Sequence, residues 1–591
     1  MLIAGLSTNI HDAAAALFED FRLLGAIQLE RLTRVKCDGG LPLAALDHLL
    51  EHAGRTRAEV DAVVLTRCNL PGRAVVRLPL LGVKKARRFW IETRLKGHAF
   101  ANVEPLLVRL YRRGHDMAYH FDVGRFARDY GFRRDVEVFF CNHHLSHALP
   151  GLFFTDWDDD VLLYTADAGG DHAHYSAHLF RGGELKTLFG GEEALLSPKQ
   201  NSLGLAYSSA TRALGFRPGR HEGKVTGLAA YGEPTLAKAF AEHYWVEETG
   251  EVASDLGDNI AVRDYFLAMA PRASREDYAA SIQKLLEDVI LAAFDRLVVR
   301  HRPRRIGLSG GVFANVKLNQ RLYERFRPAE IFVVPFMGDE GLAVGGLLQF
   351  LMARHGIAAW LAARRRLSDL YWAPPAADPR AAFAAEPWLA LLPDRPAAGA
   401  ARLVAEGRIG AVFHGAMEFG PRALGARSII ANPTRRETHD ELNRRLARTE
   451  FMPFAPYVSE DDAARVFAVD EGHRYACRFM TITVDVRPEW RERIPAVVHV
   501  DGTARPQIIE RGTNPLYYDI LREFKELTGI PVLVNTSFNL HEEPIVNGPA
   551  DCLAALRDGR IDFLATDWGI YVNAALWAER GREVHAPQAM S

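Results

Sequence analysis

The sequence predicts an α/β protein that contains more than one domain. A chain of 591 residues is longer than a single hydrophobic core supports. Short apolar runs that suit strands are followed by glycine turns and helical stretches, as in residues 306–318. The composition of residues 358–396 shifts to Ala, Pro and Arg with little periodicity, which is typical of a connection between domains. We therefore expect an N-terminal domain at 1–357, a linker at 358–397 and a C-terminal domain at 398–591.

Composition limits the classes of function. Hydrophobic residues make up 48% of the chain and charged residues 25%, which is ordinary for soluble globular proteins. The net charge of −2 gives no general attraction to nucleic acid or to an anionic membrane, so we expect neither as a partner. The 5 cysteines are scattered and form no C-x-x-C pair. This argues against a disulfide framework or a structural zinc motif and favours a reducing cytoplasm.

The N-terminal residues predict a hairpin with a polar tip. Residues 2–6 suit a strand, 7–12 a turn and 13–18 a second strand, and the polar turn residues argue against a signal peptide. His11 at this tip has a side chain whose ordinary pKa suits proton transfer near neutrality. A histidine in a surface turn is the plainer alternative. No apolar run reaches the length of a membrane span, and the longest, 341–353, suits a core helix.

Residues 71–113 are strongly basic, with aromatic residues interleaved. Such a cluster could hold an anionic substrate. A solvated helical face with its aromatic side chains packed inward is the commoner outcome, and we favour it.

A histidine-rich stretch at residues 141–148 follows the β-prone run 136–140, so we expect a strand that leads directly into a helix. His143 and His147 are four residues apart and share one face of that helix. Two imidazoles placed in this way can bind one metal ion. The alternative is that these histidines only cap and pack the helix start.

Two aspartates are candidates for the carboxylate ligands that a divalent metal site needs in addition. Asp167 ends the apolar run 161–166 and precedes a Gly-Gly turn. Asp339 lies in a loop after the apolar run 331–334.

Two further stretches suit the binding of an anion. Lys224 lies among glycines in residues 219–232, where backbone N–H groups and an ammonium could meet a phosphate, although a flexible surface loop is equally consistent. The turn with Gly310 and Gly311 lies between a strand and a helix that contains Asn315, and a helix N-terminus favours negative charge. With the Gly-Gly turn after Asp167 and the Asp339 loop, this pattern resembles the two phosphate loops of the actin-like ATPase fold.

Four rigid polar loops follow in the second domain. Arginines that are fixed in glycine- and proline-rich loops suit bidentate recognition of phosphate or carboxylate. One such loop would usually form a surface ion pair, whereas four predict a phosphate site. The loops are at residues 418–428, 448–456, 499–507 and 534–539.

Together these motifs resemble the O-carbamoyltransferases of the nodulation protein U, cephalosporin hydroxymethyl and tobramycin carbamoyltransferase type. The resemblance covers nearly the whole chain. It implies an N-terminal actin-like ATPase domain, similar to the tRNA threonylcarbamoyladenosine-forming enzymes, and a C-terminal YrdC-like α/β domain. The residues that carry it are His11-Asp12, His143 with His147, Glu222-Gly223-Lys224, Ser309-Gly310-Gly311, residues 420–425 and residues 535–539.

The resemblance also implies a reaction in two stages. Carbamoyl phosphate and ATP would form carbamoyl adenylate in the C-terminal domain. The N-terminal domain would then pass the carbamoyl group to a hydroxyl of a small-molecule acceptor, such as a sugar, an antibiotic or another natural product. The implied cofactors are ATP, carbamoyl phosphate as co-substrate, Mg²⁺, and Fe²⁺ or another divalent metal. The acceptor and the oligomeric state are not indicated, and a homodimer is possible.

Site residues follow from the resemblance by their chemistry. His11 would be the general base that takes the acceptor's proton, a contribution of about 10²–10⁴-fold in rate. The iron site is matched by His143, His147, Asp167 and Asp339. Carbamoyl adenylate would lie against Lys224, Gly310, Gly311 and Asn315. Carbamoyl phosphate and the nucleotide phosphates would be held by Arg422, Arg427, Arg448, Arg505, Asn535 and Ser537.

Two departures from the family pattern limit this transfer of roles. Arg448 is followed by Thr449 and Glu450, where many relatives have an Arg-Glu pair, so its role is the least supported of the arginines. The basic segment 71–113 matches no motif and leaves the acceptor unidentified. The alternatives are a carbamoyltransferase that acts on a protein, as in hydrogenase maturation, or on tRNA, and a non-catalytic nucleotide-binding module.

Overall fold

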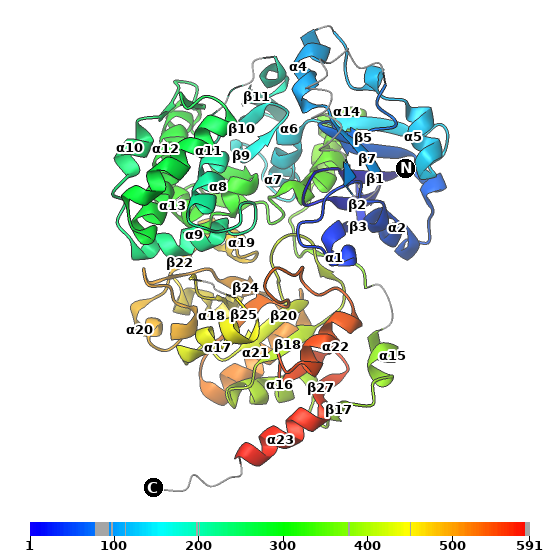
Figure 1. Cartoon of the computed structure of the whole chain (residues 1–591). Coiled ribbons are helices and arrows are strands. Elements are labelled where there is room, and N and C mark those ends of the chain that lie inside the picture. Colours follow the sequence, from blue (N-terminus) through cyan, green and yellow to red (C-terminus); the bar gives the residue numbers. More distant parts are fainter. Residues whose placement is uncertain are drawn as a thin grey trace.

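The computed structural model is a mixed α/β structure with three large sheets (Figure 1). It describes residues 1–76, 94–95, 98–112, 114–196, 199, 201–375, 379–448 and 451–584. Part of the basic segment 71–113 therefore lies outside the described residues, as do Thr449 and Glu450. We call residues 1–362, which form the first two large sheets, the N-terminal half, and residues 371–584 the C-terminal half.

The first sheet has the strand order β3-β2-β1-β4-β8. Strands β1, β2 and β3 form an antiparallel meander, and β1, β4 and β8 are parallel. The predicted N-terminal hairpin is confirmed, and β1 and β2 consist almost entirely of buried residues. The strands are β1 (Leu2–Ser7), β2 (Ala14–Glu19), β3 (Arg22–Gln28), β4 (Ala62–Thr66) and β8 (Glu137–Cys141).

The second sheet repeats this arrangement in the order β11-β10-β9-β14-β15. Strands β9, β10 and β11 are antiparallel, and β9, β14 and β15 are parallel. Because β1 and β9 hold equivalent positions, the hairpin turns that follow them are equivalent too. The strands are β9 (Val161–Gly170), β10 (Ala173–Arg181), β11 (Glu184–Phe189), β14 (Arg305–Ser309) and β15 (Glu330–Val333).

Helix α14 (Leu342–Ala362) contacts β1, β2 and β4 of the first sheet and the helix that begins at His143. Together with the turn before it, residues Asp339–Ala362, it is the one described helix that is long and apolar enough to cross a membrane by length and composition. Its residues from Leu342 to Leu348 are all buried against these elements. It is therefore packed as the core helix that the sequence predicts for residues 341–353.

The C-terminal half is built on an eight-stranded sheet in the order β17-β27-β26-β18-β20-β25-β21-β24. Residues 358–397, predicted to be a linker, contain β16 (Tyr371–Ala373), α15 (Pro379–Ala384) and β17, and β17 pairs with β27 at the sheet edge. The boundaries of the domains stay a prediction. The strands are β17 (Leu389–Leu392), β18 (Gly410–Phe413), β20 (Arg427–Ala431), β21 (Ala455–Ser459), β24 (Gln507–Ile509), β25 (Val532–Ser537), β26 (Phe563–Thr566) and β27 (Gly569–Asn573).

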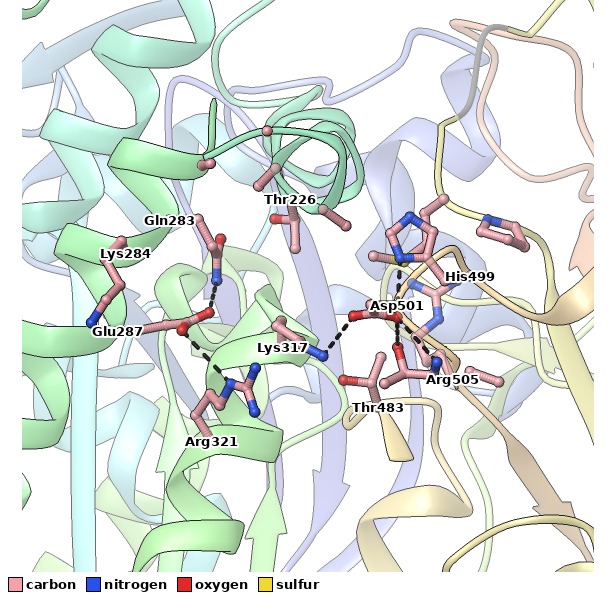
Figure 2. Close-up of a pocket in the computed structure, with 18 of the residues that line it drawn as sticks. Thr226, Gln283, Lys284, Glu287, Lys317, Arg321, Thr483, His499, Asp501 and Arg505 are labelled. Atoms are coloured by element: carbon pink, nitrogen blue, oxygen red, sulfur yellow. Dashed lines mark hydrogen bonds and ion pairs between the residues drawn. The ribbon is translucent and has the colours of Figure 1, made fainter. Parts of the chain in front are cut away.

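The two halves share buried surface. One apolar cluster continues from the second sheet into the eight-stranded sheet, so their relative position rests on hydrophobic packing. Polar contacts also cross the boundary. Figure 2 shows one of them, in which Lys317 Nζ donates a hydrogen bond of 2.7 Å to Asp501.

Candidate active site and metal centre

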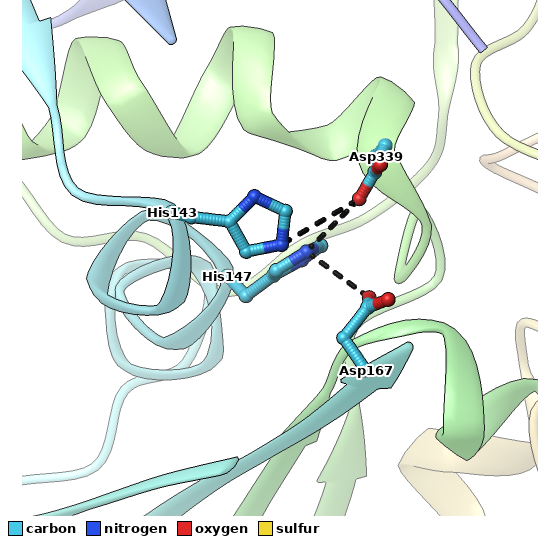
Figure 3. A group of neighbouring side chains, drawn as sticks. All are labelled: His143, His147, Asp167 and Asp339. Carbon is cyan, nitrogen blue, oxygen red and sulfur yellow. Dashed lines mark ion pairs between the residues drawn. The ribbon is translucent and has the colours of Figure 1, made fainter. Parts of the chain in front are cut away.

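The four predicted metal ligands come together in the N-terminal half (Figure 3). Helix α6 (His143–Ala148) begins directly after β8 as predicted, capped by Asn142, whose side chain accepts from Leu145 N. His143 and His147 therefore point from one helix face. Asp167 lies near the end of β9, and Asp339 begins the 3₁₀ turn η7 (Asp339–Gly341) before α14. All four residues are buried, and one ligand atom from each lies within 4.8 Å of the others.

The distances within this cluster leave some of its polar atoms unsatisfied. His147 Nε2 lies 3.4 Å from Asp167 Oδ2 and 3.4 Å from Asp339 Oδ1, and His143 Nε2 lies 3.7 Å from the same Oδ1. Among the described residues, both Nε2 atoms and Asp339 Oδ1 are buried without a hydrogen-bond partner. Buried polar groups rarely stay unpaired. Two imidazoles and two carboxylates that converge in this way fit a divalent cation.

The electrostatics of the cluster support the same interpretation. Burial opposes the charged form of His147, but Asp167 and Asp339 outweigh it and raise its pKa to about 9. Burial likewise opposes ionisation of Asp167, yet His147, His143 and the N–H of Gly311 hold its pKa below the usual range. Both carboxylates are thus negative at neutral pH, and a metal ion would take the place of the proton on His147.

Residues that the sequence analysis missed hold these ligands in place. The Asn9 side-chain amide donates to Asp339 Oδ2. Asp171 Oδ2 accepts from His143 N at 2.7 Å and from the buried Arg67 Nε at 2.7 Å. Partners of this kind fix the orientation of metal ligands. Asn9 stands in the polar turn with His11, and Asp171 follows the Gly-Gly turn, but neither position indicates the distant residue that it contacts.

His11 lies at the tip between β1 and β2, as predicted. Its side chain is 52% exposed, and its Nδ1 lies 2.9 Å from Asp12 Oδ2. Partial burial lowers the pKa of His11, but Asp12, Asp339 and Asp167 outweigh it and raise the pKa to about 9. Because the carboxylates of Asp339 and Asp167 act on this ring, His11 lies within electrostatic reach of the metal cluster.

The predicted glycine turn after β14 touches the same cluster. Gly310 has φ of +94°, and a Cβ atom there would lie 2.3 Å from Ala166 O, so only glycine fits. The N–H of Gly311 donates to Asp167 Oδ2 at 2.9 Å. At the other end of the turn, Asn315 caps α13 (Val316–Phe326) and donates to Gln283 Oε1 at 2.8 Å. Gln283 lies on α12 (Arg275–His301).

A cavity of about 290 Å³ lies beyond this turn, between the two halves of the chain (Figure 2). Gln283, Lys317 and Arg321 line it from the N-terminal half, and Asp501 and Arg505 from the C-terminal half. Burial opposes ionisation of Asp501, but His499 and Lys317 hold its pKa well below the usual range. Cationic and anionic side chains both border the cavity, since Lys317 is paired with Asp501 at 2.7 Å and Arg321 with Glu287 at 3.8 Å.

Lys224 lies close to this region without lining the cavity. It is buried on α9 (Glu222–Leu228), and the following turn of that helix packs against the C-terminal half. A Cβ atom at Gly227 would lie 2.8 Å from Met452 N. The alternative of a flexible surface loop around Lys224 is therefore wrong, because this segment is a packed helix at the boundary of the two halves.

One of the predicted arginine loops of the C-terminal half, residues 418–428, is organised by a buried glutamate. Glu418 Oε1 accepts from the N–H groups of Leu424 at 2.7 Å, Ala426 at 2.7 Å and Arg427 at 3.1 Å. The loop that carries Arg422 is folded around this carboxylate. No local pattern in the sequence marks Glu418, because its burial depends on the folded loop.

Two other predicted loops meet at strand β25. Arg448 donates to Thr536 Oγ1 at 2.8 Å, to Ser537 O at 2.8 Å and to Asn539 Oδ1 at 2.7 Å. The buried Asn535 Nδ2 donates to Ala423 O at 3.0 Å. Arg448, Asn535 and Ser537 therefore lie close to the Glu418 loop, and their contact with phosphate stays a prediction.

Comparison with known families now identifies the chain. Residues 2–348 match the model of the carbamoyltransferase N-terminus, and residues 401–571 match the model of the carbamoyltransferase C-terminus. The protein belongs to the carbamoyltransferase family. It is a carbamoyltransferase enzyme, and the resemblance inferred from its motifs is confirmed.

Relatives of this carbamoyltransferase include nodulation proteins. Nodulation protein NolNO of Sinorhizobium fredii is 31% identical over 603 residues, which cover 97% of this chain and 80% of the relative. NolO of Bradyrhizobium diazoefficiens is 34% identical over 447 residues, with 72% and 76% covered. Nodulation protein U of Rhizobium tropici is 34% identical over 312 residues, 51% of each chain.

Solved structures show weaker likeness. Component A of (R)-2-hydroxyglutaryl-CoA dehydratase from Acidaminococcus fermentans aligns over 61% of this chain and 99% of its own, with 11% identity and a TM-score of 0.31. Full-length HypF aligns over 30% of this chain and 22% of its own, with 19% identity and a TM-score of 0.22. Neither likeness carries an argument about function.

One predicted residue of the carbamoyltransferase needs correction. Arg427 is fully buried on β20, where it donates to His414 O at 2.8 Å, Ala426 O at 2.9 Å and Gly415 O at 3.1 Å. Its guanidinium also lies 3.8 Å over the ring of Phe413. These carbonyls and the ring use the donors that a phosphate would need. The geometry gives Arg427 a structural role and does not support its predicted contact with phosphate.

Proposed function

We propose that this carbamoyltransferase is an ATP-dependent O-carbamoyltransferase. It would make carbamoyl adenylate from carbamoyl phosphate and ATP and transfer the carbamoyl group to a hydroxyl of a small-molecule acceptor, such as a sugar, an antibiotic or another natural product. One observation carries the proposal. The turn at residues 310–315 contacts the metal cluster through Gly311 and the wall of the interdomain cavity through Asn315. An activated carbamoyl group and its nucleotide could therefore be held on either side of one turn.

We also propose the domain architecture that the sequence predicts. The repeated strand order of the first two sheets supports an actin-like N-terminal domain. The eight-stranded mixed sheet with its arginine loops is compatible with a YrdC-like C-terminal domain. A cytoplasmic location without nucleic-acid or membrane partners is proposed alongside, and the free state of all five cysteines supports it.

Activation would take place in the C-terminal half. Hydrolysis of carbamoyl phosphate gives carbamate and phosphate, and a carbamate oxygen then attacks the α-phosphorus of Mg²⁺-bound ATP, so that pyrophosphate leaves. Arg422 and Ser537 would bind the phosphates, and the positive charge of Arg448 would offset the charge that develops. The donors of Arg448 and of Asn535 bond protein oxygens, so these two residues would hold the loops of the site in place. Arg448 already orders the loop of Ser537 in the structure.

Transfer would take place at the N-terminal half. The adenosine end of carbamoyl adenylate would lie in the interdomain cavity against Gln283 and Lys317, with Arg505 on the opposite wall. Its phosphate would lie beside the turn with Gly310 and Gly311, whose own N–H groups donate to Met337 O at 3.0 Å and to Asp167 Oδ2 at 2.9 Å. The ammonium of Lys224, on the helix whose Thr226 contacts Asn315, would supply positive charge. The sequence assigned carbamoyl adenylate to Lys224, Gly310, Gly311 and Asn315, and this arrangement adds the cavity residues to that proposed binding site.

His11 would act as the general base in this step. As the acceptor oxygen attacks the carbamoyl carbon, His11 takes the hydroxyl proton, the bond from that carbon to the adenylate oxygen breaks, and adenosine monophosphate leaves with the electron pair. A divalent ion, Fe²⁺ by resemblance, bound by His143, His147, Asp167 and Asp339 would supply Lewis-acid polarisation. Its charge would also offset the carboxylates that raise the pKa of His11, so that the ring is neutral at a lower pH.

Pyrophosphate release without acceptor tests the proposal. The purified protein should release pyrophosphate from ATP only when carbamoyl phosphate is present. His143→Ala should abolish transfer to a hydroxyl acceptor and leave this release largely intact. His144→Gln is the matched control, because the ring of His144 bonds Thr165 Oγ1 at 2.7 Å and is not part of the cluster. Absence of carbamoyl phosphate-dependent pyrophosphate from the metal-loaded wild-type enzyme would overturn the proposal.

A further inference from the structure

A carboxylate at the boundary of the two halves collects several cationic groups. Glu542, on the loop after β25, accepts from Arg220 Nη1 at 2.7 Å and from Arg217 Nη1 at 3.0 Å. His221 Nε2 lies 2.6 Å from its other oxygen. These contacts lower the pKa of Glu542 to about 2 against the opposing effect of partial burial. Glu542 belongs to the C-terminal half and its three partners belong to the N-terminal half, so these contacts join the two halves.

The backbone of this loop is unusual at the same residue. Glu542 has φ of +64°, in the left-handed region that residues other than glycine rarely adopt. A residue held there needs support from its surroundings, and such residues cluster at functional sites. The next part of the loop is also fixed, because Arg34 donates to Pro544 O at 3.0 Å and to Ile545 O at 2.7 Å. Arg220 in turn donates to Lys36 O at 2.6 Å.

The loop lies in sequence between residues of both proposed sites. It begins at Ser537 and Asn539, which hold Arg448 in the activating half. Its partners Arg220 and His221 directly precede α9, which carries Lys224. The loop therefore links the two sites through short, polar connections.

We propose that Glu542 is a positioning residue that fixes this loop against the N-terminal half and so prevents carbamoyl adenylate from meeting water as it passes between the two sites. The inference rests on the proposed function. Hydrolysis is the competing reaction: water attacks the carbamoyl carbon, adenosine monophosphate leaves, and the carbamic acid formed breaks down to carbon dioxide and ammonia. Excluding water from a reactive intermediate is an established use of closed loops in enzymes.

A metal site is the other way to read these residues. One ligand atom each from His221, His541 and Glu542 lies within 4.8 Å of the others. However, the carboxylate already bonds two guanidinium groups, and their positive charge opposes the binding of a cation. The geometry therefore favours an ionic contact between the halves.

Coupling between activation and transfer is the quantity to measure. Pyrophosphate, ammonia and carbamoylated acceptor are determined together for the wild type, Glu542→Gln and Arg220→Ala. In both variants the ratio of pyrophosphate to carbamoylated product should rise by about fivefold or more, which is the lower end of typical coupling between two sites. The ammonia formed should account for the pyrophosphate that is released without carbamoylated product. The initial rate of pyrophosphate release without acceptor should stay within about twofold of wild type, because the phosphate-binding residues are unchanged.

Glu543→Gln is the matched control. Glu543 is the exposed neighbour on the same loop, and its bond to Asn539 uses its backbone carbonyl, which the substitution keeps. This variant should keep the wild-type ratio. An unchanged ratio in Glu542→Gln and Arg220→Ala, or a parallel fall of pyrophosphate and product, would overturn the inference. Failure of the proposed function would look different, since the wild type itself would then release no carbamoyl phosphate-dependent pyrophosphate.

Discussion

His147 Nε2 lies 3.4 Å from Asp167 Oδ2 in a buried site, too far for a good hydrogen bond and too close for two unrelated polar groups. A proton or a metal ion is needed to make this pair stable. In the metal-free protein the proton is held tightly, since the two neighbouring carboxylates raise the pKa of His147 to about 9. Metal binding and protonation therefore compete for the same atoms.

Stability should depend on pH more strongly without metal than with it. The unfolded chain has a histidine pKa of about 6.5, so protonated His147 contributes its full stabilisation below that pH. The contribution is lost as the pH rises through its folded pKa of about 9. Asp167 acts in the opposite sense, because its pKa in the folded protein is lowered. Its ionised form stabilises the fold at pH values above the ordinary pKa of an aspartate, and this contribution is lost only in acid.

Thermal unfolding with and without a chelator measures this effect. The unfolding midpoint of the metal-free protein should fall between about pH 6.5 and pH 9, and that of the protein loaded with a divalent ion should fall less. Elemental analysis of the loaded protein should find one tightly bound divalent ion per chain. Equal slopes in the two states would show that no ion replaces the proton on His147.

Asn9→Ala should weaken metal binding. The Asn9 amide donates to Asp339 Oδ2 and leaves Oδ1 to face the histidines. Loss of such an outer partner typically reduces metal affinity about 10–100-fold. Competition with a chelator of known affinity measures the change. Asn69→Ala is the control, since Asn69 donates to Asn9 at 3.3 Å and does not touch Asp339; it should have the smaller effect.

His11 sets the expected pH dependence of transfer. A general base must be neutral, so the transfer rate should rise with pH through the pKa of His11. Because Asp12 raises that pKa, Asp12→Asn should shift the rise of the transfer rate with pH to lower pH values. His11→Asn should reduce transfer about 10²–10⁴-fold and leave pyrophosphate release intact. If the pH dependence of the transfer rate were the same in Asp12→Asn as in wild type, another group would have to take the proton.

Local sequence patterns predicted the parts of this site that depend on local geometry. The spacing of His143 and His147 placed both on one helix face, and strand ends nominated Asp167 and Asp339 as further ligands. Contacts made by distant residues left no such pattern. The bond from Asn9 to Asp339 joins two loops that meet only in the folded chain. The burial of Glu418 depends on the fold of the loop that surrounds it.

Arg427 shows the same limit from the other side. Its glycine-rich loop suited a phosphate contact. No pattern in the neighbouring sequence indicated that the guanidinium would donate hydrogen bonds to the carbonyls of His414 and Gly415. In the sequence Arg422 and Arg427 have similar surroundings. In the structure Arg422 is half-buried on the loop, whereas Arg427 is fully buried inside it.

These two arginines should therefore respond differently to truncation. Arg427→Ala leaves several buried carbonyls without a donor and should lower the free energy of unfolding by about 3 kcal/mol or more. Arg427→Lys should restore little, because an ammonium lacks the planar fork that reaches several carbonyls. Arg422→Ala should keep nearly wild-type stability and lose most carbamoyl phosphate-dependent pyrophosphate release. Denaturant unfolding and the pyrophosphate assay separate the two effects. If Arg427→Ala were as stable as wild type and still inactive, its guanidinium would have to act on the substrate phosphate, as the sequence alone suggested.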